Sequence, residues 1–204
     1  GLCIGENIAM KNLEFLIKRA EASGNFLRID MENSPYTDNT LVIYKQLLQD
    51  YPRVGVVLQA YLKRTTNDIE LLNSSSFNAR ICKGIYKESP EITYQDHQEI
   101  RDHFSDAVKD ILSGEGYAAI ATHDLELIDT LEHWILENKI EQSRYEFQVL
   151  YGVPMSGRLE RLKEAGHRVR IYVPFGPDWY DYSIRRLKEN PQIISYVMKN
   201  FFRK

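Results

Sequence analysis

The sequence lacks the features that mark several classes of protein. It has only two cysteines in 204 residues, Cys3 and Cys82, and they do not form a CxxC pair. This usage indicates a reducing compartment. No apolar run approaches the roughly 18 residues of a membrane span, and we recognise no signal peptide. The formal net charge is -3 and the basic residues form no block, so nucleic acid is not an expected partner.

Motifs of several enzyme classes are also missing. We find no GxSxG, no HExxH and no metal-ligand spacing, so no metal site is predicted. The sequence SGEGY at 113–117 faintly resembles a dinucleotide loop, but it precedes a strand instead of opening a helix, and we reject it. No linker or low-complexity segment interrupts the chain. With 43% hydrophobic residues, it is predicted to form a single domain over 1–204.

Apolar periodicity predicts that strands and helices alternate. The expected strands are 26–32, 54–62, 79–86, 117–124, 145–152 and 168–175. The expected helices are 7–22, 40–51, 67–72, 99–112, 125–138 and 157–165, with two more at the end of the chain and an irregular loop at 87–98. This alternation is typical of βαβ units and a parallel sheet.

Polar residues recur near the C-terminal end of every predicted strand. Parallel strands buried on both faces are normally apolar there, and active sites of parallel barrels are built at that end. The sequence therefore predicts a functional cavity at this rim. The residues are Asp30, Glu32, Gln59, Arg80, Lys83, Thr122, His123, Asp124, Gln148 and Tyr172.

Some of these residues also have a purely structural interpretation. Asp30 could neutralise a nearby cation, and His123 could be a structural histidine with both nitrogens bonded. Arg80 and Lys83 beside Gly84 suggest an anionic ligand such as a pyrophosphate, because a glycine in a strand often marks a close approach. The alternative is that the two cations pair with Asp30 or Glu32.

Two glutamines and two arginines can also be interpreted either as ligand-binding or as structural residues. Gln59 and Gln148 suit hydrogen bonding to a flat heterocycle, although buried glutamines also bond neighbouring backbone. After the last predicted strand, a helix with Asp178 as its N-cap is expected to carry Arg185 and Arg186. Two adjacent guanidiniums can hold a small carboxylate. The alternative is a solvated helix face, on which Arg186 pairs with Glu189.

Six stretches of the sequence together resemble the proline dehydrogenase family. They are RIDME at 28–32, VVLQAYLKR at 56–64, ARICKGIYKESPE at 79–91, AAIATHD at 118–124, YEFQVLYG at 145–152 and YVPFGPDWYDYSIRRLKENP at 172–191. The resemblance implies an α/β fold, a flavin-dependent (βα)8 TIM-like barrel, of which about six βα units are present in this chain.

The resemblance also implies a reaction and roles for individual residues. The family oxidises L-proline to Δ1-pyrroline-5-carboxylate with FAD, and Asp30 and Arg80 would be catalytic. Substrate-binding positions would be Arg185 and Arg186 for the carboxylate, with Tyr86, Leu150 and Tyr172 around the ring. FAD-contacting positions would be Met31, Gln59, Lys83, Gly84, Ile85, Thr122 and His123. Electrons would pass to a membrane quinone, with a cytoplasmic protein, possible peripheral contact with the inner membrane, and a possible homo-oligomer.

The match also departs from the family pattern. It begins inside the second βα unit, so the first strand, most of the second and a lysine of that strand have no counterpart. Ile85 stands where alanine is usual, and the chain begins with Gly1. We therefore expect an N-terminally incomplete barrel with two open sheet edges. The alternatives are a truncated, non-catalytic barrel that serves as a structural or partner-bound module, and another phosphate-binding barrel enzyme.

Overall fold

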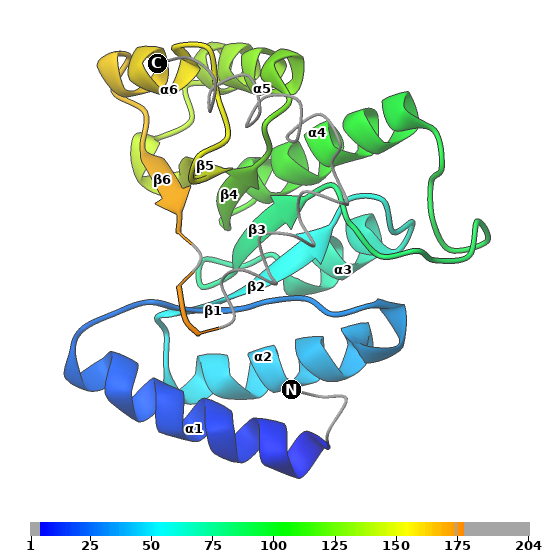
Figure 1. The fold of residues 1–204 in the computed structure, drawn as a ribbon, viewed down its shortest axis with the longest axis vertical. Helices are drawn as coiled ribbons and strands as arrows, with labels where there is room; N and C mark the ends of the chain where they lie inside the picture. Colours follow the sequence, from blue (N-terminus) through cyan, green and yellow to red (C-terminus); the bar gives the residue numbers. More distant parts are fainter. Residues whose placement is uncertain (1–4, 174, 178–204) are drawn as a thin grey trace.

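The computed structural model describes residues 5–173 and 175–177, in which strands and helices alternate along the chain (Figure 1). The strands are β1 (Leu27–Ile29), β2 (Val54–Gln59), β3 (Asn78–Cys82), β4 (Tyr117–Ala121), β5 (Tyr145–Leu150) and β6 (Val169–Tyr172). The helices are α1 (Glu6–Ala22), α2 (Thr37–Asp50), α3 (Thr65–Leu72), α4 (His97–Ser113), α5 (Leu125–Glu137) and α6 (Arg158–Glu164), with 3-10 turns η1 (Ser34–Tyr36) and η2 (Gln142–Arg144).

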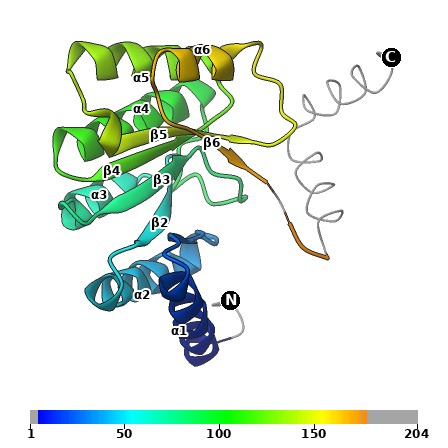
Figure 2. The same cartoon turned by 90° about the vertical axis from the view of Figure 1, so that its left-hand side faces the viewer.

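The six strands form one parallel sheet in the order of the sequence, β1 to β6. The sheet is curled into a half-barrel with the helices on its outer side, as Figure 2 shows from the side. Within the described residues, β1 and β6 each pair with one strand only. The predicted α/β fold with about six βα units of a barrel is therefore confirmed.

Strand alternation decides which side chains meet the helices. Val56 is in register with Ala79, and Ile120 is in register with both Ile81 and Phe147. All five belong to the buried core, which also contains the apolar faces of α2, α4 and α5. Because successive side chains of a strand point to opposite faces, the intervening residues of each strand face the inside of the half-barrel.

The inner face is unusually polar. Along β2, β3 and β5 it carries Gln59, Arg80, Glu146 and Gln148, and Arg28 joins them from β1. Burial lowers the pKa of Arg28 to about 10, and the nearby Arg80 acts in the same direction. Arg28 donates to the backbone carbonyls of Val56 and Asn78. Polar side chains therefore extend from the rim of the half-barrel into its interior.

Several strands end earlier than the sequence predicted. The strand expected over 79–86 ends at Cys82, and the one expected over 117–124 ends at Ala121. The backbone of Gly84 turns into the positive-φ region (φ 105°), and Asp124 leaves the strand to cap α5 by accepting a hydrogen bond from Leu127 N–H. The polar residues predicted at strand ends therefore lie mostly in the loops that follow the strands.

Other boundaries differ as well. β1 ends at Ile29 and not at 32, and β2, β5 and β6 are also shorter than expected. α4 begins at His97 because the Asp96 carboxylate accepts from the backbone N–H groups of Gln98 and Glu99. α3 begins two residues before the expected start, at Thr65.

Among the described helices, none is long and apolar enough to cross a membrane.

Candidate active site

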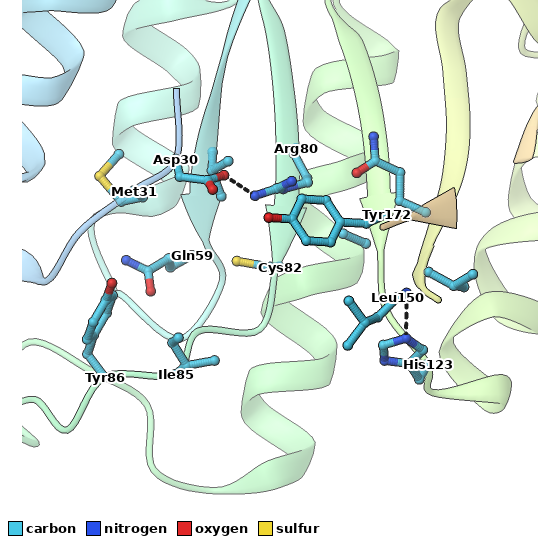
Figure 3. A pocket seen from close by; sticks show the side chains of 14 residues that line it. Asp30, Met31, Gln59, Arg80, Cys82, Ile85, Tyr86, His123, Leu150 and Tyr172 are labelled. Atoms are coloured by element: carbon cyan, nitrogen blue, oxygen red, sulfur yellow. Dashed lines mark hydrogen bonds and ion pairs between the residues drawn. The ribbon is translucent and has the colours of Figure 1, made fainter. Parts of the chain in front are cut away.

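A cavity of about 290 Å³ opens at the C-terminal rim of the half-barrel. Figure 3 shows side chains from several strands and loops converging on it. Ten of the residues that the sequence singled out line it: Asp30, Met31, Gln59, Arg80, Ile85, Tyr86, His123, Gln148, Leu150 and Tyr172. These residues are spread over more than 140 positions of the chain, and they all line one cavity. The predicted convergence at one rim is therefore present in the structure.

Arg80 and Asp30 form an ion pair on one wall of the cavity (Figure 3). The Arg80 side chain is 18% exposed and that of Asp30 is 63% exposed. The guanidinium carbon of Arg80 also lies 5.8 Å from the ring centroid of Tyr172, within range of a cation–π contact. The structural alternative for Arg80, a pair with Asp30, is thus present, and the pair itself faces the cavity.

His123 lies on the opposite side of the cavity from Gln59 (Figure 3). Its Nε2 accepts a hydrogen bond from the backbone N–H of Leu150 at 2.9 Å. This bond places the ring proton on Nδ1, and burial lowers the pKa of His123 below its usual value. The histidine is therefore neutral at pH 7, with Nδ1–H as its remaining donor.

Lys83 does not line the cavity, and neither do Gly84 and Thr122. The Lys83 ammonium instead binds the Asp124 carboxylate at 2.6 Å, and Arg101 binds the other carboxylate oxygen at 3.0 Å. The structural alternative for Lys83, an ion pair with Asp30 or Glu32, was wrong in its partner. Thr122 Oγ1 accepts from the backbone N–H of Asp124 at 3.2 Å, so it shapes the same turn.

The backbone of Gly84 is closely approached by a neighbouring side chain. A Cβ atom at this position would overlap the aromatic ring of Tyr61. Within the described residues, the close approach at this glycine is made by the aromatic side chain of Tyr61. The consequence is that Gly84 sets the path of the loop carrying Ile85 and Tyr86 to the cavity.

We expect Asp124→Asn to lower the free energy of unfolding by roughly 1–2 kcal/mol at pH 7. Burial works to raise the pKa of Asp124, but the hydrogen bonds from Lys83 and from the Leu127 N–H, together with the charges of Lys83 and Arg101, outweigh it, so the folded-state pKa is lowered. A lowered carboxyl pKa stabilises the fold above the unfolded value of about 3.9, and this contribution disappears as the pH falls through the folded-state value.

Denaturant unfolding of both proteins between pH 3 and 7 tests this expectation. The difference between the two unfolding free energies should be constant near neutrality and should shrink toward zero below about pH 4. Glu126→Gln is the matched control, because its exposed carboxylate shares Arg101 but does not cap α5. A difference that persists unchanged into acid would contradict an electrostatic role for Asp124.

Some functional candidates lie outside the described residues, and others were not predicted. Arg185, Arg186, Asp178 and Glu189 all fall outside the described part of the chain. The cavity is also lined by Val57, Cys82, Ala121 and Val149, which the sequence patterns did not single out. Alternation could have placed Val57 and Cys82, since each shares a strand face with a predicted polar residue two positions away.

Comparisons with known proteins place the chain in a family. The family model described as proline dehydrogenase matches residues 4–199. Proline dehydrogenase 1 of Bacillus subtilis (strain 168) is 36% identical over 204 residues, which cover 100% of this chain and 67% of that protein. Proline dehydrogenase of Deinococcus radiodurans is 33% identical over 201 residues, which cover 98% of this chain and 64% of that protein.

Solved structures show the same fold. Proline utilization A (PutA) from Bdellovibrio bacteriovorus, inactivated by N-propargylglycine, matches with a TM-score of 0.80 and 24% identity. That match covers 89% of this chain and 22% of the PutA chain. This chain therefore spans about two thirds of the curated relatives and about a fifth of the PutA protein. By sequence and by fold, the chain belongs to the proline dehydrogenase family of oxidoreductases.

Proposed function

We propose that this barrel oxidises L-proline to Δ1-pyrroline-5-carboxylate with FAD as the hydride acceptor. The observation that carries the proposal is the rim cavity, which brings Asp30, Arg80 and Tyr172 together although they come from different strands and loops. The family membership supports proline as the substrate. Bound FAD would supply the chemistry that no side chain has, because it accepts the hydride that leaves C5 of proline.

The residues of the cavity fit a flat, partly polar cofactor. The carbonyl oxygens of Gln59 and Gln148 are acceptors for donor groups of a heterocycle, and Met31 and Ile85 supply apolar surface. Arg80 adds a positive charge beside which a developing negative charge is stabilised. Ligand sites in proteins typically combine apolar walls with a few fixed polar groups of this kind.

The remaining residues would hold the substrate. Tyr86, Leu150 and Tyr172 line the cavity and would pack around the pyrrolidine ring. Arg185 and Arg186 would bind the carboxylate by the family resemblance. Holding both partners in one geometry is the main requirement, since hydride transfer depends on positioning more than on a strong base.

The further family properties are also proposals for this chain. We propose that a membrane quinone reoxidises the flavin, with L-proline the reductant, and that the protein is cytoplasmic with peripheral contact to the inner membrane. A homo-oligomer is a further proposal, because the two edges of the sheet offer backbone for pairing. Turnover with a short-chain quinone as the only acceptor, and sedimentation with inner-membrane vesicles, test these points.

The experiment that tests the function is an anaerobic titration of the purified chain. After addition of FAD and removal of the unbound excess, the protein should show flavin absorbance, and L-proline should bleach it. D-proline is the control, since its α-carbon has the opposite configuration and directs the carboxylate to the other face of the ring. Protein that binds no added FAD would overturn the proposal and favour a non-catalytic barrel.

Arg185→Met tests the proposed carboxylate contact. We expect the KM for proline to rise roughly 100-fold, equivalent to about 3 kcal/mol, because removing one partner of a desolvated charge pair leaves the other unpaired. Steady-state kinetics with an artificial acceptor measure it. Lys45→Met, an exposed change on α2, is the control. An unchanged KM in Arg185→Met would point to another phosphate-binding or anion-binding barrel enzyme.

A further inference from the structure

Both glutamines of the cavity use the same end of their amide within the protein. Gln59 Nε2 donates to the backbone carbonyl of Glu32 at 3.0 Å, and Gln148 Nε2 donates to Glu146 Oε1 at 2.6 Å. The two residues are only 3% and 6% exposed. Since a primary amide has a donor end and an acceptor end, each glutamine keeps its carbonyl oxygen for the cavity. Neither oxygen has a hydrogen-bond partner among the described residues.

The partner of Gln148 is a buried carboxylate below the cavity. Glu146 precedes Gln148 by two residues on the inner face of β5 and is 3% exposed. Its Oε1 also accepts from Arg170 Nε at 2.8 Å.

The charge of Glu146 decides which way the Gln148 amide turns. Burial works to raise the pKa of Glu146, but hydrogen bonds from Arg170 and Gln148 lower it further than burial raises it. The group is therefore ionised at neutral pH. An ionised carboxylate only accepts hydrogen bonds, so it can bind the amide nitrogen of Gln148 but not the amide oxygen.

We propose that Glu146 is a positioning residue that holds the Gln148 amide with its carbonyl oxygen toward the cavity, so that the site takes a ligand with an N–H or O–H donor there. The inference deepens the proposed function, on which it rests, because a flavin ring is a heterocycle with such a donor. A ligand that presented an acceptor or a methyl group instead would leave the buried oxygen unpaired and would be rejected.

A double-mutant cycle tests the inference. The variants are Glu146→Gln, Gln148→Leu and the double substitution, with FAD affinity measured by titration of flavin fluorescence. A glutamine at 146 can offer either amide end, so the Gln148 orientation is no longer fixed and we expect about ten-fold weaker FAD binding. In the Gln148→Leu background, Glu146→Gln should cause no further loss, because there is no amide left to orient.

Glu132→Gln is the matched control. Glu132 is 5% exposed, lies on α5, and pairs with Arg161 on the outer side of the sheet. It has no link to the cavity lining, so the control measures the loss of a buried carboxylate without the loss of amide positioning. FAD affinity should be unchanged in Glu132→Gln even where thermal stability falls.

A ligand-free measurement gives a second readout. The side-chain NH2 signals of Gln148, assigned by their absence in Gln148→Leu, should be shifted downfield and protected from exchange in the unmodified chain. Both properties should be lost in Glu146→Gln but retained in Glu132→Gln. A purely structural role for Glu146 would not single out this one amide.

Each outcome has one meaning. Equal effects of Glu146→Gln in both backgrounds, or an unprotected Gln148 amide in the unmodified chain, would overturn the inference while leaving the proposed function intact. No FAD binding by the unmodified chain would overturn both. If Glu146→Gln does not fold because Arg170 is left without its partner, Glu146→Gln combined with Arg170→Gln restores a neutral pair, and the cycle is run in that background.

Discussion

Replacing Arg80 with Met is expected to slow the reduction of bound flavin by L-proline about 1000-fold. The guanidinium lines the cavity beside Tyr172 and is 18% exposed, so its charge acts in a partly desolvated site. Preorganised positive groups of this kind are worth most where negative charge develops during the reaction. Stopped-flow absorbance under anaerobic conditions measures the rate directly.

The fold should tolerate this substitution, which makes the kinetic result interpretable. The partner of Arg80 is Asp30, whose side chain is 63% exposed. Water can therefore solvate the carboxylate once the guanidinium is gone, and no buried charge is stranded. We expect the free energy of unfolding to change by less than about 1 kcal/mol, and FAD still to bind.

Two companion variants separate the role of the charge from the role of the ion pair. Arg80→Lys keeps the charge but not the planar fork, so its rate should fall between those of the unmodified chain and Arg80→Met. Asp30→Asn removes the ion pair and leaves Arg80 in place. If Asp30→Asn slowed reduction as much as Arg80→Met, the pair and not the cation would be the functional unit. A normal rate in Arg80→Met would reduce Arg80 to a partner for Asp30.

The alternation of parallel strands and helices was predictable because it depends on local patterns. Apolar runs such as that of β2 are long enough to be recognised, and a helix between successive strands requires them to be parallel. The ends of the strands were not predictable to the residue. The ends of β3 and β4 depend on Gly84, whose backbone turns to a positive φ against Tyr61, and on Asp124, which caps α5.

The convergence of polar residues on one cavity was predictable, but the contacts between them were not. Polar side chains after parallel strands must meet at one rim, which is why Asp30, Arg80 and His123 line one cavity. Which acid pairs with which cation depends on distances between loops, and sequence carries little information about these. Lys83 therefore binds Asp124, although Asp30 and Glu32 were equally plausible partners by sequence.

The buried Glu146 shows the same limit in another form. It lies on the same strand face as Gln148, because the two residues are two positions apart in β5, and this spacing is visible in the sequence. Its importance depends on Arg170, which the sheet register places beside Gln148 on the neighbouring strand. A glutamate inside an apolar strand is a signal worth following, because a buried charge requires such a partner.

Gly84→Ala is expected to lower the free energy of unfolding by roughly 4 kcal/mol and to weaken FAD binding. The backbone at Gly84 has φ 105°, which strains any residue with a Cβ by about 1–3 kcal/mol. The new methyl group would also overlap the ring of Tyr61, and overpacking of a buried site costs about 1–3 kcal/mol more. Urea unfolding and FAD titration measure the two effects.

The overlap cannot be relieved by a small local shift, because the backbone of Tyr61 is hydrogen-bonded to the loop that contains Gly84. Tyr61 N–H donates to the carbonyl of Lys83 at 2.9 Å, and Ala60 N–H donates to that of Cys82 at 2.8 Å. Tyr61 is also 7% exposed, so its ring has little free space. Moving the ring away from residue 84 would pull on the segment that carries Cys82 and Ile85 to the cavity.

Two comparisons divide the effect into strain and overlap. Gly152 has φ 82°, and no atom lies within 4 Å of the position that a Cβ would take there, so Gly152→Ala should cost only the backbone strain, about 1–2 kcal/mol. In a Tyr61→Ala background the overlap at residue 84 is removed, and Gly84→Ala should then cost about as much as Gly152→Ala. Equal costs of Gly84→Ala with and without the Tyr61 ring would show that the ring does not set the path of this loop.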